Sequence, residues 1–188
     1  MLYIVMGVAA YLFFVVYDIN SILIKNKLLR GSFFAGFILL TGATAGIVVS
    51  SRKMIQLDWS RIFVCGTIAL LFFLLLIYTL FFALPFQDTY LERDSAPRLY
   101  RGGVYALCRH PGVLWFIGFY FALGQALRLP LLLIASAVFS SLNILYVLFQ
   151  DCWTFRKVFP DYDEYKKETP FLLPNLTSIK CCFRTIWN

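Results

Sequence analysis

The only histidine of the chain lies in a short run of residue types that can bind an anion and move a proton. Arg109 and His110 directly precede Pro111 and Gly112. Proline favours the first turn of a helix, because the amide hydrogen that it lacks would have no partner there. The free N–H groups at such a helix start, together with the guanidinium of Arg109, suit a carboxylate or a phosphate. The spacing equally favours an alternative, in which Arg109 and His110 anchor a membrane helix at the headgroup level.

Two segments around this run resemble one known family. The run Tyr100–Trp115 (YRGGVYALCRHPGVLW) resembles the Gly-x-Tyr and Arg-His-Pro signature of the isoprenylcysteine carboxyl methyltransferase family and its bacterial relatives. The run Phe159–Tyr165 (FPDYDEY), with the Thr-Pro and the proline that follow it, is similar to that family's C-terminal pattern. The resemblance covers about residues 100–175, and the order and separation of the two motifs make it more specific than either motif alone.

The resemblance implies an all-α membrane bundle that holds S-adenosylmethionine at its cytoplasmic face and methylates a lipophilic or small acceptor. The cofactor carboxylate would face Arg109, its ribose diol would bind Asp151, and its sulfonium would lie against aromatic rings. In-line methyl transfer depends on positioning and on exclusion of water. Arg109 and His110 are therefore the expected catalytic residues. The expected cofactor-binding residues are Tyr105, Arg109, His110, Pro111, Gly112, Asp151, Tyr162 and Tyr165.

The chain also departs from that family's pattern. Asp151-Cys152 lies where relatives carry a Glu-Glu pair, and Val113 lies where they carry a tyrosine. Relatives that methylate a carboxylate carry an arginine shortly before the glutamates, whereas Leu129–Phe155 holds no basic residue, so we do not expect a carboxyl-methylating activity. Two other functions stay open, a nicotinamide-dependent membrane reductase of related fold and a non-catalytic membrane scaffold.

The elements that must position these residues are apolar helices. Of the 188 residues, 61% are hydrophobic and only 14% are charged, which excludes a water-soluble domain of ordinary composition. Uncharged stretches reach the length of roughly 20 residues that a helix needs to cross a bilayer. We therefore predict an all-α integral membrane protein with about five transmembrane helices. The expected crossings are Leu2–Ile24, Gly31–Ser51, Ile62–Gln87, Gly112–Leu127 and Leu129–Gln150.

We expect a single membrane domain. Residues 1–84 would form a three-helix scaffold, 85–111 a cytoplasmic loop with the Arg-His-Pro motif, 112–150 a helical hairpin, and 151–188 an amphipathic tail that closes the cofactor site. The helix over 112–127 is short, about 24 Å against a hydrocarbon thickness near 30 Å, which predicts a recess at its cytoplasmic start. Asp18 is expected to reach water at the end of the first helix.

The distribution of charge predicts the orientation in the membrane. Thirteen of the 17 basic residues would lie on the side of the tail, which the positive-inside rule assigns to the cytoplasm, so the N-terminus is expected outside. The net charge of +7 therefore indicates topology and no nucleic-acid partner. The expected partners are the lipid bilayer and the acceptor, and the oligomeric state stays open. Five cysteines show no metal-ligand spacing, and no metal is expected.

Overall fold

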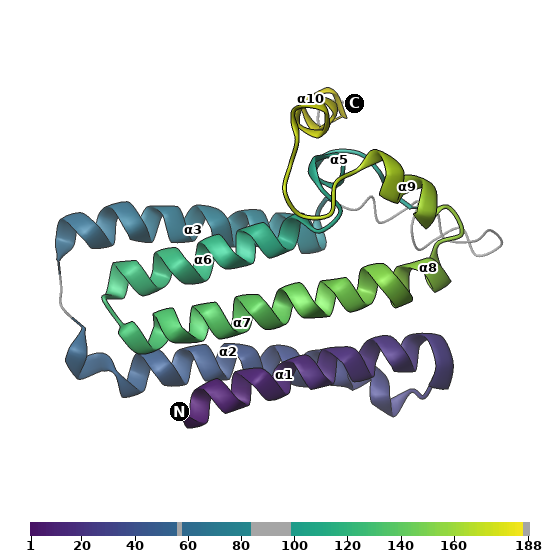
Figure 1. The fold of residues 1–188 in the computed structure, drawn as a ribbon. Coiled ribbons are helices and arrows are strands. Elements are labelled where there is room, and N and C mark those ends of the chain that lie inside the picture. Colours follow the sequence, from purple (N-terminus) through teal and green to yellow (C-terminus); the bar gives the residue numbers. More distant parts are fainter. Residues whose placement is uncertain (56–57, 84–98, 186–188) are drawn as a thin grey trace.

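The computed structural model describes residues 1–55, 58–83 and 99–185, and in this part of the chain every regular element is a helix (Figure 1). Four helices are long and apolar enough to cross a membrane, and a fifth apolar helix, Pro111–Leu127, is shorter. The predicted all-α integral membrane fold is confirmed. The four long helices are Leu2–Ile24, Leu28–Ser50, Trp59–Phe81 and Pro130–Val158.

The five apolar helices form one bundle. The helices are α1 (Leu2–Ile19), α2 (Ser32–Ser50), α3 (Trp59–Phe81), α6 (Pro111–Leu127) and α7 (Pro130–Phe149). In this bundle α1 and α2, α3 and α6, and α6 and α7 are antiparallel pairs, whereas α1 and α7 run in the same direction. Helix α6 packs between α3 and α7, and α1 packs on both α2 and α7 (Figure 1). The link between α6 and α7 is the pair Arg128-Leu129, in which Arg128 adopts a left-handed conformation, so the predicted hairpin forms.

Two helix ends differ from the predicted ends by three residues or more. The third helix starts at Trp59, three residues before Ile62, and Asp58 caps it by accepting a hydrogen bond from the backbone N–H of Arg61 at 3.3 Å. Its predicted end at Gln87 lies outside the described residues. The last long helix does not end at Gln150. It continues through the π-helical turn η4 (Gln150–Thr154) into α8 (Phe155–Val158), because the wider turn accommodates polar side chains without breaking the helix.

One end of the bundle carries most of the polar elements, and we call it the tail end. It holds the α1–α2 connection and the short helices α5 (Val104–Leu107), α9 (Tyr162–Glu168) and α10 (Leu176–Thr185). Helix α10 is seen end-on in Figure 1, so it lies across the direction of the long helices. The opposite end holds the 3-10 turn η3 (Arg52–Met54) and the α6–α7 link.

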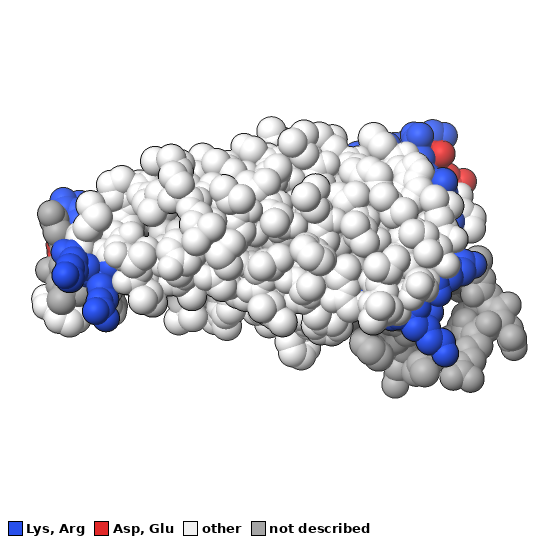
Figure 2. Space-filling view, turned by 90° about the horizontal axis from the view of Figure 1, so that it is seen from below, with Lys and Arg blue, Asp and Glu red and all other residues white. Residues whose placement is uncertain are grey.

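The face of the bundle between the two ends carries no charge. In the view of Figure 2, Lys, Arg, Asp and Glu side chains gather at the ends and leave a white band between them. On several of the long helices large apolar side chains are exposed, among them Phe37 on α2, Phe63 on α3 and Leu145 on α7. Such a band is the surface that a helix bundle presents to lipid.

The α1–α2 connection is a fixed turn. Helix α1 ends in the π-helical turn η1 (Asn20–Ile24), and the 3-10 turn η2 (Leu28–Gly31) leads into α2. Lys25 has a positive φ of 56°, and this left-handed conformation costs a residue with a Cβ about 1–2 kcal/mol. The buried side chain of Asn20 holds this backbone, because it donates to the Asn26 carbonyl at 3.0 Å and accepts from the Asn26 N–H at 2.9 Å.

Close approach and one polar network connect α1 with α7. A side chain at Gly7 would overlap the ring of Phe139, which is fully buried. The prediction that Asp18 reaches water is wrong: the residue is buried at 4% exposure. Its carboxylate accepts hydrogen bonds from Gln150 at 3.0 Å and from Thr154 at 3.5 Å, and these partners on the far helix replace water.

Candidate active site at the tail end of the bundle

The Arg-His-Pro run forms a short extended link between two helices. Cys108 has an extended backbone after α5, and His110 precedes the first residue of α6, Pro111. The backbone N–H of Arg109 donates to the Pro170 carbonyl at 2.9 Å. The first of the two resembling segments is therefore bonded directly to the second.

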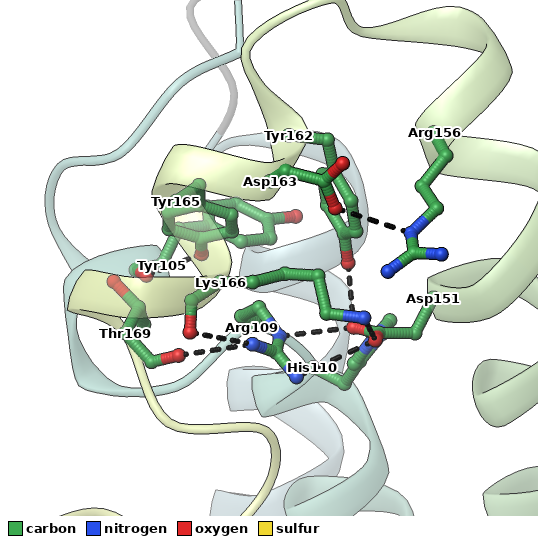
Figure 3. A network of polar contacts seen from close by, with 10 residues as sticks. All are labelled: Tyr105, Arg109, His110, Asp151, Arg156, Tyr162, Asp163, Tyr165, Lys166 and Thr169. Carbon is green, nitrogen blue, oxygen red and sulfur yellow. Dashed lines mark hydrogen bonds and ion pairs between the residues drawn. The ribbon is translucent and has the colours of Figure 1, made fainter.

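The side chain of Arg109 extends this contact between the segments (Figure 3). Its Nη1 donates to the backbone carbonyls of Lys166 at 3.1 Å and Thr169 at 3.3 Å. Its Nε lies 2.9 Å from a carboxylate oxygen of Asp151, and Phe171 lies beneath the guanidinium at 5.5 Å. The Arg109 side chain is only 9% exposed, so these partners take the place of water around the charge.

The carboxylate of Asp151 is the centre of the site. Asp151 lies in the π-helical turn η4, and its side chain is 5% exposed. Its partners are the ammonium of Lys166 at 2.7 Å, the hydroxyl of Tyr162 at 2.7 Å, Nε of Arg109 at 2.9 Å and Nε2 of His110 at 3.3 Å. We call these five residues the Asp151 cluster (Figure 3).

His110 is buried between aromatic rings within this cluster. Its ring stacks on Phe155 with a centroid distance of 5.8 Å and meets the edge of Phe171 at 5.1 Å. Burial lowers the pKa of His110 below its ordinary value of 6.5, although the hydrogen bond and the charge of Asp151 oppose the shift. A neutral imidazole beside an ionised carboxylate must place its proton on Nε2, which leaves Nδ1 as an acceptor.

Helix α9 presents three of its residues to the site. Tyr162, Tyr165 and Lys166 are spaced three and four apart and so share one face of this helix. Burial raises the pKa of the Tyr162 and Tyr165 hydroxyls, which therefore act as hydrogen-bond donors. The Tyr165 hydroxyl donates to the Tyr105 carbonyl at 2.6 Å, and the Tyr105 hydroxyl donates to the Thr79 carbonyl on α3 at 3.0 Å.

Further contacts hold the tail in place beside the site. Arg101 pairs with Asp161 at 2.7 Å and with Glu168 at 3.3 Å, which are on or next to α9. Gly103, with a positive φ of 56°, donates its backbone N–H to the hydroxyl of Thr185 on α10 at 2.9 Å. The ends of α9 and α10 are thus bonded to the segment that precedes α6.

The structure brings most of the predicted site residues together. Arg109, His110, Asp151 and Tyr162 make direct contacts. The ring of Tyr165 lies 6.0 Å from that of Tyr162 between centroids, and its hydroxyl donates to the Tyr105 carbonyl. Pro111 is fully buried at the start of α6. Gly112 instead lies against α3, where an added Cβ would meet Leu76 at 3.7 Å.

Three contributors to the site were not predicted from the sequence. Lys166 makes one of the two shortest contacts with Asp151, and Phe155 and Phe171 enclose the His110 ring. The spacing of Lys166 four residues after Tyr162 was an available signal, since both residues then share one helix face. No signal in the sequence distinguished the two phenylalanines from the other 18 in the chain.

The Asp151 cluster carries an excess positive charge. Arg109 and Lys166 contribute two cations, Asp151 contributes one anion, and His110 is neutral, which leaves a net charge of +1 in a mostly buried site. Burial raises the pKa of the adjacent Cys108 thiol to about 11, which keeps it protonated and unreactive. Within the described residues, no group of three or more His, Cys, Asp or Glu side chains is placed to hold a metal ion.

The site can therefore attract one further anionic group, and His110 Nδ1 can accept a proton. Such an arrangement is compatible with binding a small zwitterionic molecule at the membrane surface. Comparison with known protein families, with curated proteins and with solved structures finds no match for this chain. The protein is an all-α integral membrane protein with a buried, positively charged cluster at one end of its bundle.

Proposed function

We propose that the protein is a membrane-embedded methyltransferase of the isoprenylcysteine carboxyl methyltransferase-like family, which uses S-adenosylmethionine to methylate a lipophilic or small acceptor. The observation that carries the proposal is the contact between the two resembling segments. Arg109 is bonded to Lys166, Thr169 and Pro170, which lie about 60 positions farther along the chain. The resemblance requires these segments to form one site, and their contact supports it.

The charge of the cluster fits the carboxylate of the cofactor. Arg109 and Lys166 share a single carboxylate, and the side chain of Lys166 is the more accessible of the two cations at 22% exposure. An incoming carboxylate would neutralise the remaining positive charge. Lys166 is therefore added to the proposed cofactor-binding residues.

Asp151 has a different proposed role from the one expected for it. Its two oxygens already serve four partners, so a ribose diol would have to displace one of them. We assign Asp151 as a positioning residue that orients Arg109, Lys166 and the His110 ring.

The aromatic rings and the histidine fit the reaction itself. When bound, S-adenosylmethionine supplies an activated methyl group on a sulfonium, and cations of this kind favour aromatic faces such as those of Tyr162, Phe155 and Phe171. These rings also exclude water. His110 Nδ1 is the group that accepts a proton from a hydroxyl, thiol or amine acceptor. A lipophilic acceptor would approach from the bilayer beside the short helix α6.

The orientation in the membrane is part of the proposal. Of the 15 basic residues in the described part of the chain, 11 belong to segments of the tail end, which we infer to be cytoplasmic, with the N-terminus on the other side. Cys152 and Cys181 are exposed at the tail end and provide a direct test. A membrane-impermeant maleimide should label them only after the cells are permeabilised. Labelling of Cys152 or Cys181 in intact cells would show that the orientation is the opposite of the one proposed.

Cofactor binding is the decisive test of the function. We would titrate detergent-purified protein with S-adenosylmethionine by calorimetry and compare Lys166→Gln with Lys167→Gln, its exposed neighbour outside the cluster. Loss of one buried charge contact should weaken binding by at least about tenfold in Lys166→Gln, and Lys167→Gln should stay within about twofold. Unchanged thermal unfolding midpoints would show that both variants fold.

Either negative result would overturn the proposal. If the folded wild-type protein does not bind S-adenosylmethionine, the methyltransferase assignment fails, and binding of NADPH under the same conditions would instead support a membrane reductase. Equal affinities of the two lysine variants would show that the cofactor does not bind at the Asp151 cluster.

A further inference from the structure

A hollow of about 620 Å³ lies at the α1–α2 turn, and none of its lining residues belongs to the Asp151 cluster. Its volume is within the range of small-molecule sites. The lining combines two cations, one hydroxyl and three aromatic rings. The lining residues are Tyr17, Ser21, Lys25, Arg30, Phe33 and Phe34, and we call this site the turn hollow.

The two cations of the turn hollow have no ion-pair partner among the residues that the structure describes. In residues 1–55, 58–83 and 99–185, no carboxylate forms an ion pair with Lys25 or Arg30. The neighbouring carboxylate of Asp18 is buried and turned to Gln150 and Thr154 on the last long helix. The turn hollow is therefore positively charged and suited to an anion.

The backbone that presents these cations is fixed before any ligand arrives. Lys25 is held in a left-handed conformation by the pair of hydrogen bonds between Asn20 and Asn26. The hydroxyl of Ser21 already donates to the Asp18 carbonyl at 2.8 Å. A bound anion would therefore be held by Lys25 and Arg30. Such preorganisation reduces the entropy lost on binding.

The rings of the turn hollow continue into the apolar surface of the bundle. Phe33 contacts Tyr17 at 5.4 Å and Phe34 at 5.9 Å between ring centroids. On α2 the exposed side chains of Phe37 and Ile38 follow directly along the helix. An apolar chain attached to an anion bound in the turn hollow could therefore extend along the band that faces lipid.

We propose that the turn hollow binds an anionic phospholipid, with its phosphate at Lys25 and Arg30 and its acyl chains along the ring surface of α2. Basic residues in a membrane-protein turn often serve only as anchors. The hollow, the fixed turn and the adjoining rings distinguish this turn from a simple anchor. This site is independent of the proposed methyltransferase activity.

Native mass spectrometry of the detergent-purified full chain tests the site. The probes are dioleoylphosphatidylglycerol, dioleoylphosphatidylcholine and inorganic phosphate. The variant is Lys25→Asn with Arg30→Gln, because asparagine tolerates the left-handed conformation that Lys25 adopts. The matched control is Arg52→Gln with Lys53→Gln, which removes two exposed charges from η3 at the opposite end.

We expect the wild-type protein to prefer phosphatidylglycerol to phosphatidylcholine. The Lys25/Arg30 variant should lose about 30-fold in affinity for phosphatidylglycerol, since each basic residue near an anionic lipid contributes about fivefold. The Arg52/Lys53 control should stay within about twofold. The charge-conserving pair Lys25→Arg with Arg30→Lys should restore most of the binding.

Three results would contradict the proposal. Equal affinity of the wild-type protein for both lipids would show that the site does not select a lipid by its negative charge. Equal losses in the two double variants would show a general effect of charge rather than a site. If inorganic phosphate binds as tightly as phosphatidylglycerol, the ligand of the turn hollow is a free anion and not a lipid.

Discussion

The membrane-crossing scaffold and the tail end of this protein are held together in different ways. In the scaffold, α1, α2 and α7 meet through small residues and rings, such as Gly7 against Phe139 and Ala10 and Ala43 with no exposed surface. At the tail end, one carboxylate collects two cations and two neutral donors. Lipid tails are as apolar as leucine, so scaffold helices associate through fit of shape, whereas buried charges associate through pairing.

Removal of the central carboxylate should have the largest effect on the tail end. Asp151→Ala leaves Arg109 and Lys166 without their shared anion, and we expect the free energy of unfolding to fall by about 3–5 kcal/mol. Denaturant titration in detergent measures this change. The control is Asp163→Ala, whose ion pair with Arg156 is largely exposed and contributes about 0–1 kcal/mol. Similar losses in both variants would show that the Asp151 cluster does not stabilise the fold.

The scaffold should respond to added volume instead. Gly7→Ala forces a methyl group into the buried ring of Phe139, and overpacking of this kind costs about 1–3 kcal/mol. Gly42→Ala is the matched control, because nothing lies within 4 Å of an added Cβ there. It should be neutral or stabilising by up to about 1 kcal/mol, as alanine favours helix over glycine. The same titration measures both, and a harmless Gly7→Ala would contradict packing by shape.

The tail end should also respond to pH through His110. Its pKa is lowered by burial, so the unfolded chain takes up a proton as the pH falls through about 6.5 while the folded protein does not. Stability is then fully present above this pH and declines below it, by at most about 1.4 kcal/mol per pH unit. The unfolding midpoint measured from pH 7.5 to 5.5 should fall less steeply in His110→Asn, whose charged neighbours Arg109, Asp151 and Lys166 are unchanged. Identical slopes would exclude His110 as the titrating group.

The smallest effect is expected at the edge of the tail end. Arg101→Gln removes ion pairs with Asp161 and Glu168, whose side chains are 42% and 66% exposed. Water screens such pairs, so the loss should be about 0.2–1 kcal/mol each. A loss as large as that of Asp151→Ala, measured in the same detergent, would remove the distinction between buried and exposed pairing.

The apolar segments could be predicted from the sequence because hydropathy is a local property. Gly112–Leu127 and Leu129–Gln150 were expected as a hairpin with one short member, and both helices form. The continuation of the last helix to Val158 was not expected. The π-helical turn at Gln150–Thr154 places Gln150 toward Asp18 and Asp151 toward Arg109, and both partners lie far away in the sequence.

The candidate site could be predicted only in part. The resemblance indicated Arg109, His110 and Asp151, and the structure places them in contact, while their catalytic and binding roles stay a prediction. Lys166 was missed although it follows Tyr162 by four residues, a spacing that Lys167 lacks, because only the rotation of α9 relative to η4 shows that this helix face meets Asp151. Asp18 was expected in water because its partners, Gln150 and Thr154, are 132 and 136 positions away and could not be identified from the sequence.

During biosynthesis, Arg109 is made well before the groups that partner it. Asp151 follows 42 positions later and the Thr169 carbonyl 60 positions later. At about 5–20 residues per second, the full set of contacts becomes possible only after roughly 3–12 s. Until Asp151 is made, the start of α6 carries an unpaired guanidinium, which resists burial. A nascent chain that stops before Asp151 would therefore keep this charge at the membrane surface, and the start of α6 would reach its final position only after the last long helix has been made.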